Sequence, residues 1–214
     1  MFRLRLVLAS LALIFATTAA VAFSDGPSPQ TLAFDIRRHD ETIGRHVMVI
    51  SQRPGRVEVT TDVDVKVSIF GLTAYRFTQR GSEIWEHDRL KRLSMVADDD
   101  GTKHVIEAEA TAGGLRITAD GKTIQHAAIP PATLWHPLPA TTTQVLDPAD
   151  GTINTVTVRD LGLESVSVRG QPVQARHWRW VGEYGRDVWY DAGGRLVQVY
   201  IRGDDGSDIF YVLK

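Results

Sequence analysis

Cysteine is absent from the 214-residue chain, which excludes a disulfide framework, thiol chemistry and a lipid-bearing cysteine. The sequence also lacks a Gly-x-Ser-x-Gly segment, the nucleophile elbow of many hydrolases. No glycine-rich loop stands between a strand pattern and a helix pattern, which argues against a nucleotide-dependent enzyme. Stability must therefore come from a hydrophobic core, and no catalytic signature indicates an enzyme.

Neither the charged residues nor the histidines form a pattern that indicates a nucleic-acid or metal partner. The formal net charge is −2 and no long basic block occurs, so we expect no nucleic-acid partner. The seven histidines occur singly, with neither His-x-His nor HExxH spacing. Residues 98–109 imitate part of a calcium loop, but Lys103 stands where such a loop requires glycine. We expect no metal and no cofactor.

The longest apolar run lies at the N-terminus and has the pattern of a secretory signal peptide. Arg3 and Arg5 precede the apolar residues 6–16, and Ala20-Val21-Ala22 forms a small-x-small cleavage site. The run is too short for a membrane anchor. We expect a cleaved leader over residues 1–22 and a periplasmic or secreted, non-lipidated protein with no integral membrane segment after leader removal.

The mature chain reads as a short linker over residues 23–31 and one antiparallel β domain over residues 32–214. Its clearest strand is Arg56–Ile69, where valine and other apolar residues alternate strictly with charged and polar ones. At about 3.3 Å per residue this strand would be roughly 45 Å long, which requires a twisted and tilted sheet. The sequence therefore predicts a curved sheet that forms a barrel or half-barrel.

Glycine- and aspartate-bearing turns divide the rest of the chain into short strands, giving an all-β meander of about 13 strands. Gly81-Ser82 is expected to break one of them. Residues 128–143 contain four prolines and are expected to form the only long loop, with room for one helical turn around residues 132–135. Residues 174–214 close the chain as four strands whose alternating aromatic residues are interpreted as core.

Several short motifs stand out along the chain. They are Gly71-Leu72, Tyr75-Arg76, Glu83 with Trp85, Asp98 to Gly101, Gly113-Gly114-Leu115, Trp135 with Pro137, Trp189-Tyr190-Asp191 and Gly194-Arg195-Leu196. Together they resemble a family of secreted bacterial proteins known only as a domain of unknown function. The resemblance covers roughly residues 34–213 and implies a single-domain β architecture in the bacterial envelope, without catalytic residues to carry over. In shape alone, the exported antiparallel design is also similar to periplasmic lipid and lipoprotein carriers, a likeness that implies no function by itself.

One group of candidate ligand-binding residues combines a cation, a carboxylate and two aromatic rings. In one interpretation Arg76 projects into a cavity and pairs with an anionic headgroup, while Tyr75 and Trp85 line the cavity. In the other, Arg76 pairs with Glu83 on the solvent face, and Tyr75 and Trp85 belong to the core. The residue pattern favours the second interpretation.

The second group of candidates lies in the proline-rich loop, because long loops on β scaffolds commonly cover binding sites. Trp135 would stack on a ligand, and His136 could act as an acid, a base or an anion contact. Alternatively, Trp135 plugs the open end of the barrel and His136 is solvated.

Three functions follow from these candidates. The first is an exported protein that holds a hydrophobic or amphiphilic, lipid-like small molecule in the concave face of the sheet. An alternative is a barrel isomerase or hydrolase in which His136 works with a carboxylate such as Glu83 or Asp191. A second alternative is an envelope assembly protein that binds an envelope protein partner through an exposed edge at Asp208–Leu213.

Overall fold

The computed structural model describes residues 28–203 and 205–214, so the expected signal peptide lies outside the described residues. The described residues form fourteen strands in one antiparallel sheet and no helix. The strands are β1 (Gln30–Arg38), β2 (Glu41–Arg53), β3 (Arg56–Ile69), β4 (Leu72–Glu86), β5 (Arg89–Asp99), β6 (Thr102–Thr111), β7 (Gly114–Ala119), β8 (Lys122–His126), β9 (Gln144–Leu146), β10 (Ile153–Val168), β11 (Gln171–Gly182), β12 (Arg186–Asp191), β13 (Leu196–Arg202) and β14 (Asp208–Leu213).

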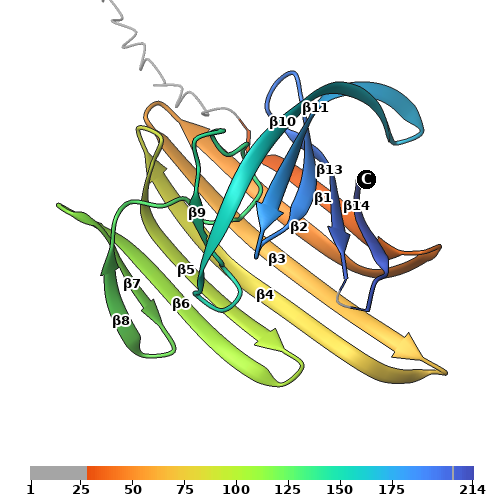
Figure 1. Cartoon of the computed structure of the whole chain (residues 1–214), viewed down its shortest axis with the longest axis horizontal. Coiled ribbons are helices and arrows are strands. Elements are labelled where there is room, and N and C mark those ends of the chain that lie inside the picture. The colour runs from red at the N-terminus through yellow and green to blue at the C-terminus, as the bar shows by residue number, and fades with distance from the viewer. Residues whose placement is uncertain (1–27, 204) are drawn as a thin grey trace, which may run out of the picture.

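The sheet is a meander with one long-range pairing. Its order is β8-β7-β6-β5-β4-β3-β2-β1-β14-β13-β12-β11-β10-β9, so the first and last strands of the chain meet in the middle. Figure 1 shows β2–β6 side by side as one curved floor, with β10 and β11 arching over it. The sheet stays unclosed, with the short strands β8 and β9 as its edges. The expectation of a single curved antiparallel sheet is confirmed.

The position of β14 contradicts one expectation from the sequence. Asp208–Leu213 pairs with β1 on one side and with β13 on the other, so its backbone groups are not an exposed edge. The expectation that Asp208–Leu213 forms an exposed edge is therefore wrong. The edge strands are five and three residues long, and short edges resist pairing with another chain.

Several strand boundaries differ from those predicted, because residues that were expected to end a strand lie within one. Strand β3 has the expected bounds, whereas β4 runs through Gly81-Ser82 without a break. Strand β10 likewise continues through an irregularity between Asp160 and Gly162. Strand β1 begins at Gln30, inside the expected linker, and residues 132–135 form no helical turn. No helix in the described part of the chain is long and apolar enough to cross a membrane.

Inward-facing side chains of the curled sheet form three apolar clusters. The largest joins β1–β3 to β10–β14 and contains Phe34, Met48 and Trp180. A second lies on β4–β7 and β9 with Trp85 at one end, and a third lies near the far ends of β2 and β3. The groove described below lies at the Trp85 end of the second cluster.

Glycine at position 81 lets β4 lie unusually close to β5. A Cβ atom at Gly81 would lie 2.2 Å from the carbonyl oxygen of Ser94 and 2.3 Å from the sulfur of Met95, which is buried. We expect Gly81→Ala to lower the free energy of unfolding by about 1–3 kcal/mol, as overpacking does, in urea denaturation. Gly113→Ala is the matched control because its Cβ would meet no atom within 4 Å. Equal stability of the two variants would contradict this account.

Candidate functional site

Residues 135–137 of the proline-rich loop form a wall between two surface depressions. The larger is a groove of about 1330 Å³ between the loop and the hairpin turns that follow β2, β4 and β6. The smaller, of about 480 Å³, lies toward β1 and the turn between β12 and β13. Trp135, His136 and Pro137 line both. The loop therefore lies between the two depressions and contributes to the wall of each.

The loop rests on the inner face of β4 through aromatic contacts. The Trp135 and Trp85 rings meet edge to face with centroids 5.5 Å apart. The His136 ring lies edge-on to both, 4.9 Å from Trp85 and 4.2 Å from Trp135. Trp85 is buried, whereas Trp135 and His136 are half-buried and face the groove. Two apolar rings and one titratable ring thus form a single aromatic surface.

A buried carboxylate beneath this surface fixes the orientation of both indoles. Glu83 is 1% exposed and accepts hydrogen bonds from the indole N–H groups of Trp85 (2.8 Å) and Trp135 (3.3 Å) at the same oxygen. Its other oxygen, Oε1, has no hydrogen-bond partner, and the buried hydroxyl of Thr133 lies nearby without hydrogen-bonding geometry. Glu83 therefore supports the site from below and is not among the residues that line the groove.

Burial shifts the pKa of both titratable groups, Glu83 and His136. It raises the pKa of Glu83 to about 7, against the opposing effect of the indole N–H groups of Trp85 and Trp135. It lowers the pKa of His136, only partly offset by the carbonyl of Pro137, which lies 3.0 Å from Nδ1. Near neutral pH the imidazole is therefore uncharged, and the aromatic surface presents little charge to the groove.

Tyr190, a buried residue of β12, anchors the loop from within the core. Its hydroxyl lies 3.1 Å from the carbonyl oxygen of Leu134 and 3.0 Å from that of His136, so it can donate to either side of Trp135. Leu134 itself has a φ of 69°, a left-handed conformation that side chains other than glycine rarely adopt. The loop is thus held in one shape by buried contacts at both ends of the tryptophan.

The groove has an apolar floor and a mostly cationic rim. Apolar side chains along it include Val57, Trp85, Leu90, Leu115 and Ile129. The rim carries Arg53, Arg56, Arg89 and Lys91 with a single acid, Asp88. Arg56 is paired with Glu58 and Glu86, and Lys91 with Glu86. Such a surface suits a molecule with a long apolar part and a polar end.

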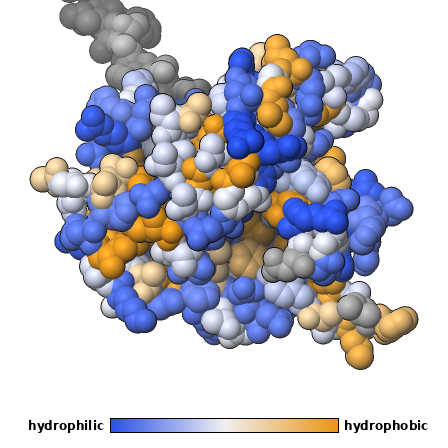
Figure 2. Space-filling model, in the orientation of Figure 1, coloured by the Kyte–Doolittle hydropathy of each residue, from blue (hydrophilic) through white to orange (hydrophobic). Residues whose placement is uncertain are grey.

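The structure separates the sequence-predicted site residues into two groups. Trp85, Trp135 and His136 come together at the groove, but Tyr75 and Arg76 lie about ten residues away along β4, roughly 33 Å. They cannot line the same cavity. Figure 2 shows apolar side chains at the tip of the β3–β4 hairpin, the end of the molecule to which Tyr75 belongs.

Both interpretations of the first group need correction. Arg76 is exposed and lies opposite Lys66 on β3, so it neither enters a cavity nor pairs with Glu83. Glu83 points inward with Trp85, and Tyr75 is 37% exposed instead of core. Trp85 alone is where the core interpretation expects it.

The acid–base pairing needed for the enzyme hypothesis is absent at His136. Among the described residues, no hydrogen bond or ion pair joins His136 to a carboxylate, and its Nδ1 is bound to the Pro137 carbonyl. Asp191 shares the smaller depression with His136, while Glu83 is shielded by the two indoles. The site therefore offers surfaces for binding and no assembled catalytic pair.

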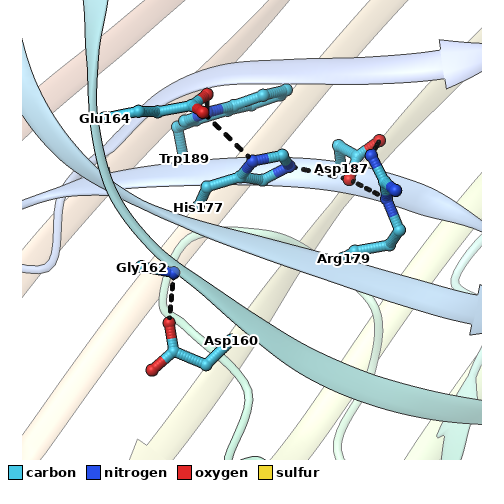
Figure 3. Close-up of polar contacts among 7 residues, drawn as sticks. All are labelled: Asp160, Gly162, Glu164, His177, Arg179, Asp187 and Trp189. Atoms are coloured by element: carbon cyan, nitrogen blue, oxygen red, sulfur yellow. Dashed lines mark hydrogen bonds and ion pairs between the residues drawn. The ribbon is translucent and has the colours of Figure 1, made fainter.

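A second polar cluster, drawn in Figure 3, lies on the face of β11 opposite Trp178 and Trp180. His177 sits between two carboxylates, with Nε2 2.7 Å from Asp187 Oδ1 and Nδ1 3.5 Å from Glu164 Oε2. Its ring stacks on Trp189 at 4.2 Å, and the Trp189 indole donates to Glu164. Arg179 donates to Asp187 at 2.7 Å. Both imidazole nitrogens are occupied, so the cluster links β10, β11 and β12 instead of presenting a free acid or base.

This cluster predicts a stability effect. Asp187 is nearly buried and accepts from both Arg179 and His177. Replacing Asp187 with asparagine should lower the free energy of unfolding by about 1.5–3 kcal/mol, as expected for lost hydrogen bonds between charged groups. Urea denaturation measures the loss, with Glu109→Gln at an exposed ion pair as the control that should change little. An Asp187→Asn variant as stable as this control would show that the cluster does not hold the strands together.

Sequence reasoning treats His177 as one of several isolated histidines and misses this cluster. The sequence feature that could have located the cluster is the register of the hairpin formed by β11 and β12. A turn centred near residue 183 places His177 opposite Trp189 and Arg179 opposite Asp187. In the described residues, no group of three or more His, Asp or Glu side chains is arranged to hold a metal ion.

Comparison with known proteins places the chain among proteins without an assigned function. The family model described as "Domain of unknown function (DUF6134)" matches residues 34–214. No curated protein matches the chain. The chain is similar to the crystal structure of a "Beta-barrel-like Protein of Domain of Unknown Function DUF1849" from Brucella abortus, with 11% identity, a TM-score of 0.62, and coverage of 87% of this chain and 95% of that chain. At this identity the similarity shows the fold alone.

Proposed function

Because the chain belongs to the DUF6134 family, whose description assigns no activity, we propose its function from the geometry of the site. The protein is exported to the bacterial envelope and binds a hydrophobic or amphiphilic small molecule in the groove beside residues 135–137. Export is supported by the sequence pattern of residues 1–22. The observation that carries binding is the groove of about 1330 Å³, walled by Trp135 and His136 over an apolar floor.

The groove is large enough for a lipid-like chain. Pockets for drug-sized ligands are typically about 300–1,000 Å³, so this groove exceeds that range and remains open to solvent along its length. An apolar chain would lie on Trp135, Trp85 and Leu90 and remove their surface from water, at about 0.8 kcal/mol per buried methylene of the ligand. The polar end would meet the rim, where Arg89 and Arg53 form no ion pair among the described residues.

Binding of an uncharged amphiphile tests this function. We expect dodecanol, added to the wild-type protein below its solubility limit, to change the tryptophan fluorescence saturably, because Trp135 and Trp85 lie at the groove. Trp135→Ala should weaken the affinity by at least about tenfold, as loss of a central aromatic contact does. Trp178→Ala is the matched control, since Trp178 is also half-buried but lies outside the groove.

Two outcomes would count against the proposal. A fluorescence response that never saturates means that dodecanol does not bind at a defined site. Equal affinity in the wild-type protein, Trp135→Ala and Trp178→Ala means that binding takes place away from the groove.

A further inference from the structure

Buried polar side chains without hydrogen-bond partners gather on the inner face of β2, β3 and β4, away from the Trp135 groove. His46, Thr61 and Gln79 are 4%, 7% and 8% exposed. Both ring nitrogens of His46, the hydroxyl of Thr61 and the amide nitrogen of Gln79 make no hydrogen bond. Buried polar groups are nearly always paired in folded proteins, so a group of unpaired ones points to a bound partner.

The strand register places these three residues in one patch. His46 and Gln79 both lie beside Val63 of β3, on its two neighbouring strands. Thr61 is two residues from Val63 and therefore faces the same side. Gln79 is six residues from Trp85 along β4, about 20 Å, so the patch and the groove are separate.

A cation on another strand lies within electrostatic range of His46. Arg186, the first residue of β12, is close enough to His46 to lower its pKa and to Tyr211 to oppose the rise in pKa that burial causes there. The ring of Tyr211 in turn meets His46 edge to face at 5.8 Å. β2 and β14 therefore meet beside the patch, and Arg186 of β12 lies within electrostatic range of a residue on each.

Arg186 has no carboxylate partner of its own in the described part of the chain. Its guanidinium lies 3.5 Å from the centroid of the Tyr184 ring and 5.7 Å from that of Trp180, and its Nε is buried without a hydrogen bond. None of the ion pairs of the described residues includes it. Asp147 lies within electrostatic range, but its Oδ1 accepts the Ala149 N–H instead. A half-buried guanidinium held by aromatic rings is therefore left with free donors.

We propose that Arg186, Gln79, Thr61 and His46 form a binding site for an anion, the phosphate or carboxylate of a free ion or of an amphiphile's polar end. The unpaired atoms of Thr61, Gln79 and Arg186 can donate hydrogen bonds, as can one of the two ring nitrogens of neutral His46. A planar guanidinium is suited to bind the two oxygens of such a group. Figure 2 shows a recess with apolar walls in the middle of the drawn face, where Figure 1 places β2 and β3 behind β11–β14. The site shares no residue with the Trp135 groove and does not depend on it.

Calorimetric titration at pH 7 with inorganic phosphate and with monododecyl phosphate, below its micellar concentration, tests the site. We expect at least one of the two to bind saturably. Tight binding of phosphate would identify a free anion as the ligand, and binding of the dodecyl ester alone, if it is lost in Arg186→Gln and kept in Trp135→Ala, would identify an amphiphile at this site rather than in the Trp135 groove. Arg186→Gln should weaken binding on the order of tenfold or more. Arg202→Gln, at an exposed ion pair on β13, should leave it unchanged.

A second readout in the wild-type protein keeps the test decisive if Arg186→Gln fails to fold. The pKa of His46, followed by NMR of the imidazole, should rise from about 4 when the anion binds, because a negative charge beside the ring stabilises its protonated form. The charged groups that already act on His46 are Arg186 and Asp62, and neither is altered in this measurement. The proposal is overturned if neither ligand binds saturably, if Arg186→Gln binds as well as the wild type, or if the pKa of His46 does not move.

Discussion

Replacing Glu83 with glutamine is expected to raise the free energy of unfolding by about 3 kcal/mol at pH 8 and to leave it unchanged at pH 4. Burial raises the pKa of Glu83 from 4.5 to about 7 in the folded protein. Between these two values the folded state holds a proton that the unfolded state has lost, so stability falls as pH rises from 4.5 to 7. Glutamine carries no such charge and can still accept from the indoles of Trp85 and Trp135.

Urea denaturation at pH 4 and pH 8 measures this effect. Glu107→Gln is the matched control, because Glu107 is exposed and its replacement should change stability little at either pH. An Glu83→Gln variant that is less stable than the wild type at pH 8 would show that the charged carboxylate stabilises the loop, contrary to this account.

The second large effect belongs to His46 and has the opposite sign. Burial lowers the pKa of His46 from 6.5 to about 4, helped by Arg186 and opposed by Asp62. The unfolded state therefore binds a proton between pH 6.5 and 4 that the folded state does not, and about 3 kcal/mol of stability is lost as pH falls through this window. His46→Phe keeps the ring contacts with Phe34 and Tyr211 but cannot titrate, so this loss should disappear.

In the wild-type protein the two effects oppose one another. As pH rises from about 4.5 to 6.5, the stability lost through Glu83 and the stability gained through His46 have similar size. The free energy of unfolding of the wild-type protein should therefore change little over this range. Stability measured across this range should fall with rising pH in His46→Phe and rise with pH in Glu83→Gln. Parallel pH profiles of the two variants would contradict both assigned pKa shifts.

The sheet can be predicted from the sequence because most of its strands are marked by local patterns of residues. The alternation in Arg56–Ile69 and the glycine-bearing turns locate most strands, and their number and antiparallel order follow. The pairing of β1 with β14 is not local, since nothing near either strand indicates that the two ends of the chain meet. That is why Asp208–Leu213 resembles an edge in the sequence and lies in the middle of the sheet.

The role of Glu83 was missed because Gly81 reads as a turn. Gly81 remains within β4, so the alternation set by Phe77 continues through Gln79 to Glu83 and Trp85 on the inner face. If the strand were broken at Gly81, the alternation would not continue past it, and Glu83 could face solvent and pair with Arg76. The aromatic loop could be located from its prolines and from Trp135, but its contact with Glu83 depends on packing between segments about 50 residues apart.

Native mass spectrometry of the protein purified gently, without detergent, from the cells that produce it tests most directly whether it holds a lipid-like ligand. The account predicts a bound species with the mass of an amphiphile on the wild-type protein. The occupancy should fall markedly in Trp135→Ala and stay at the wild-type level in Trp178→Ala. Protein that is repeatedly found empty, with tryptophans that remain unprotected when fatty acids are added, would contradict the account.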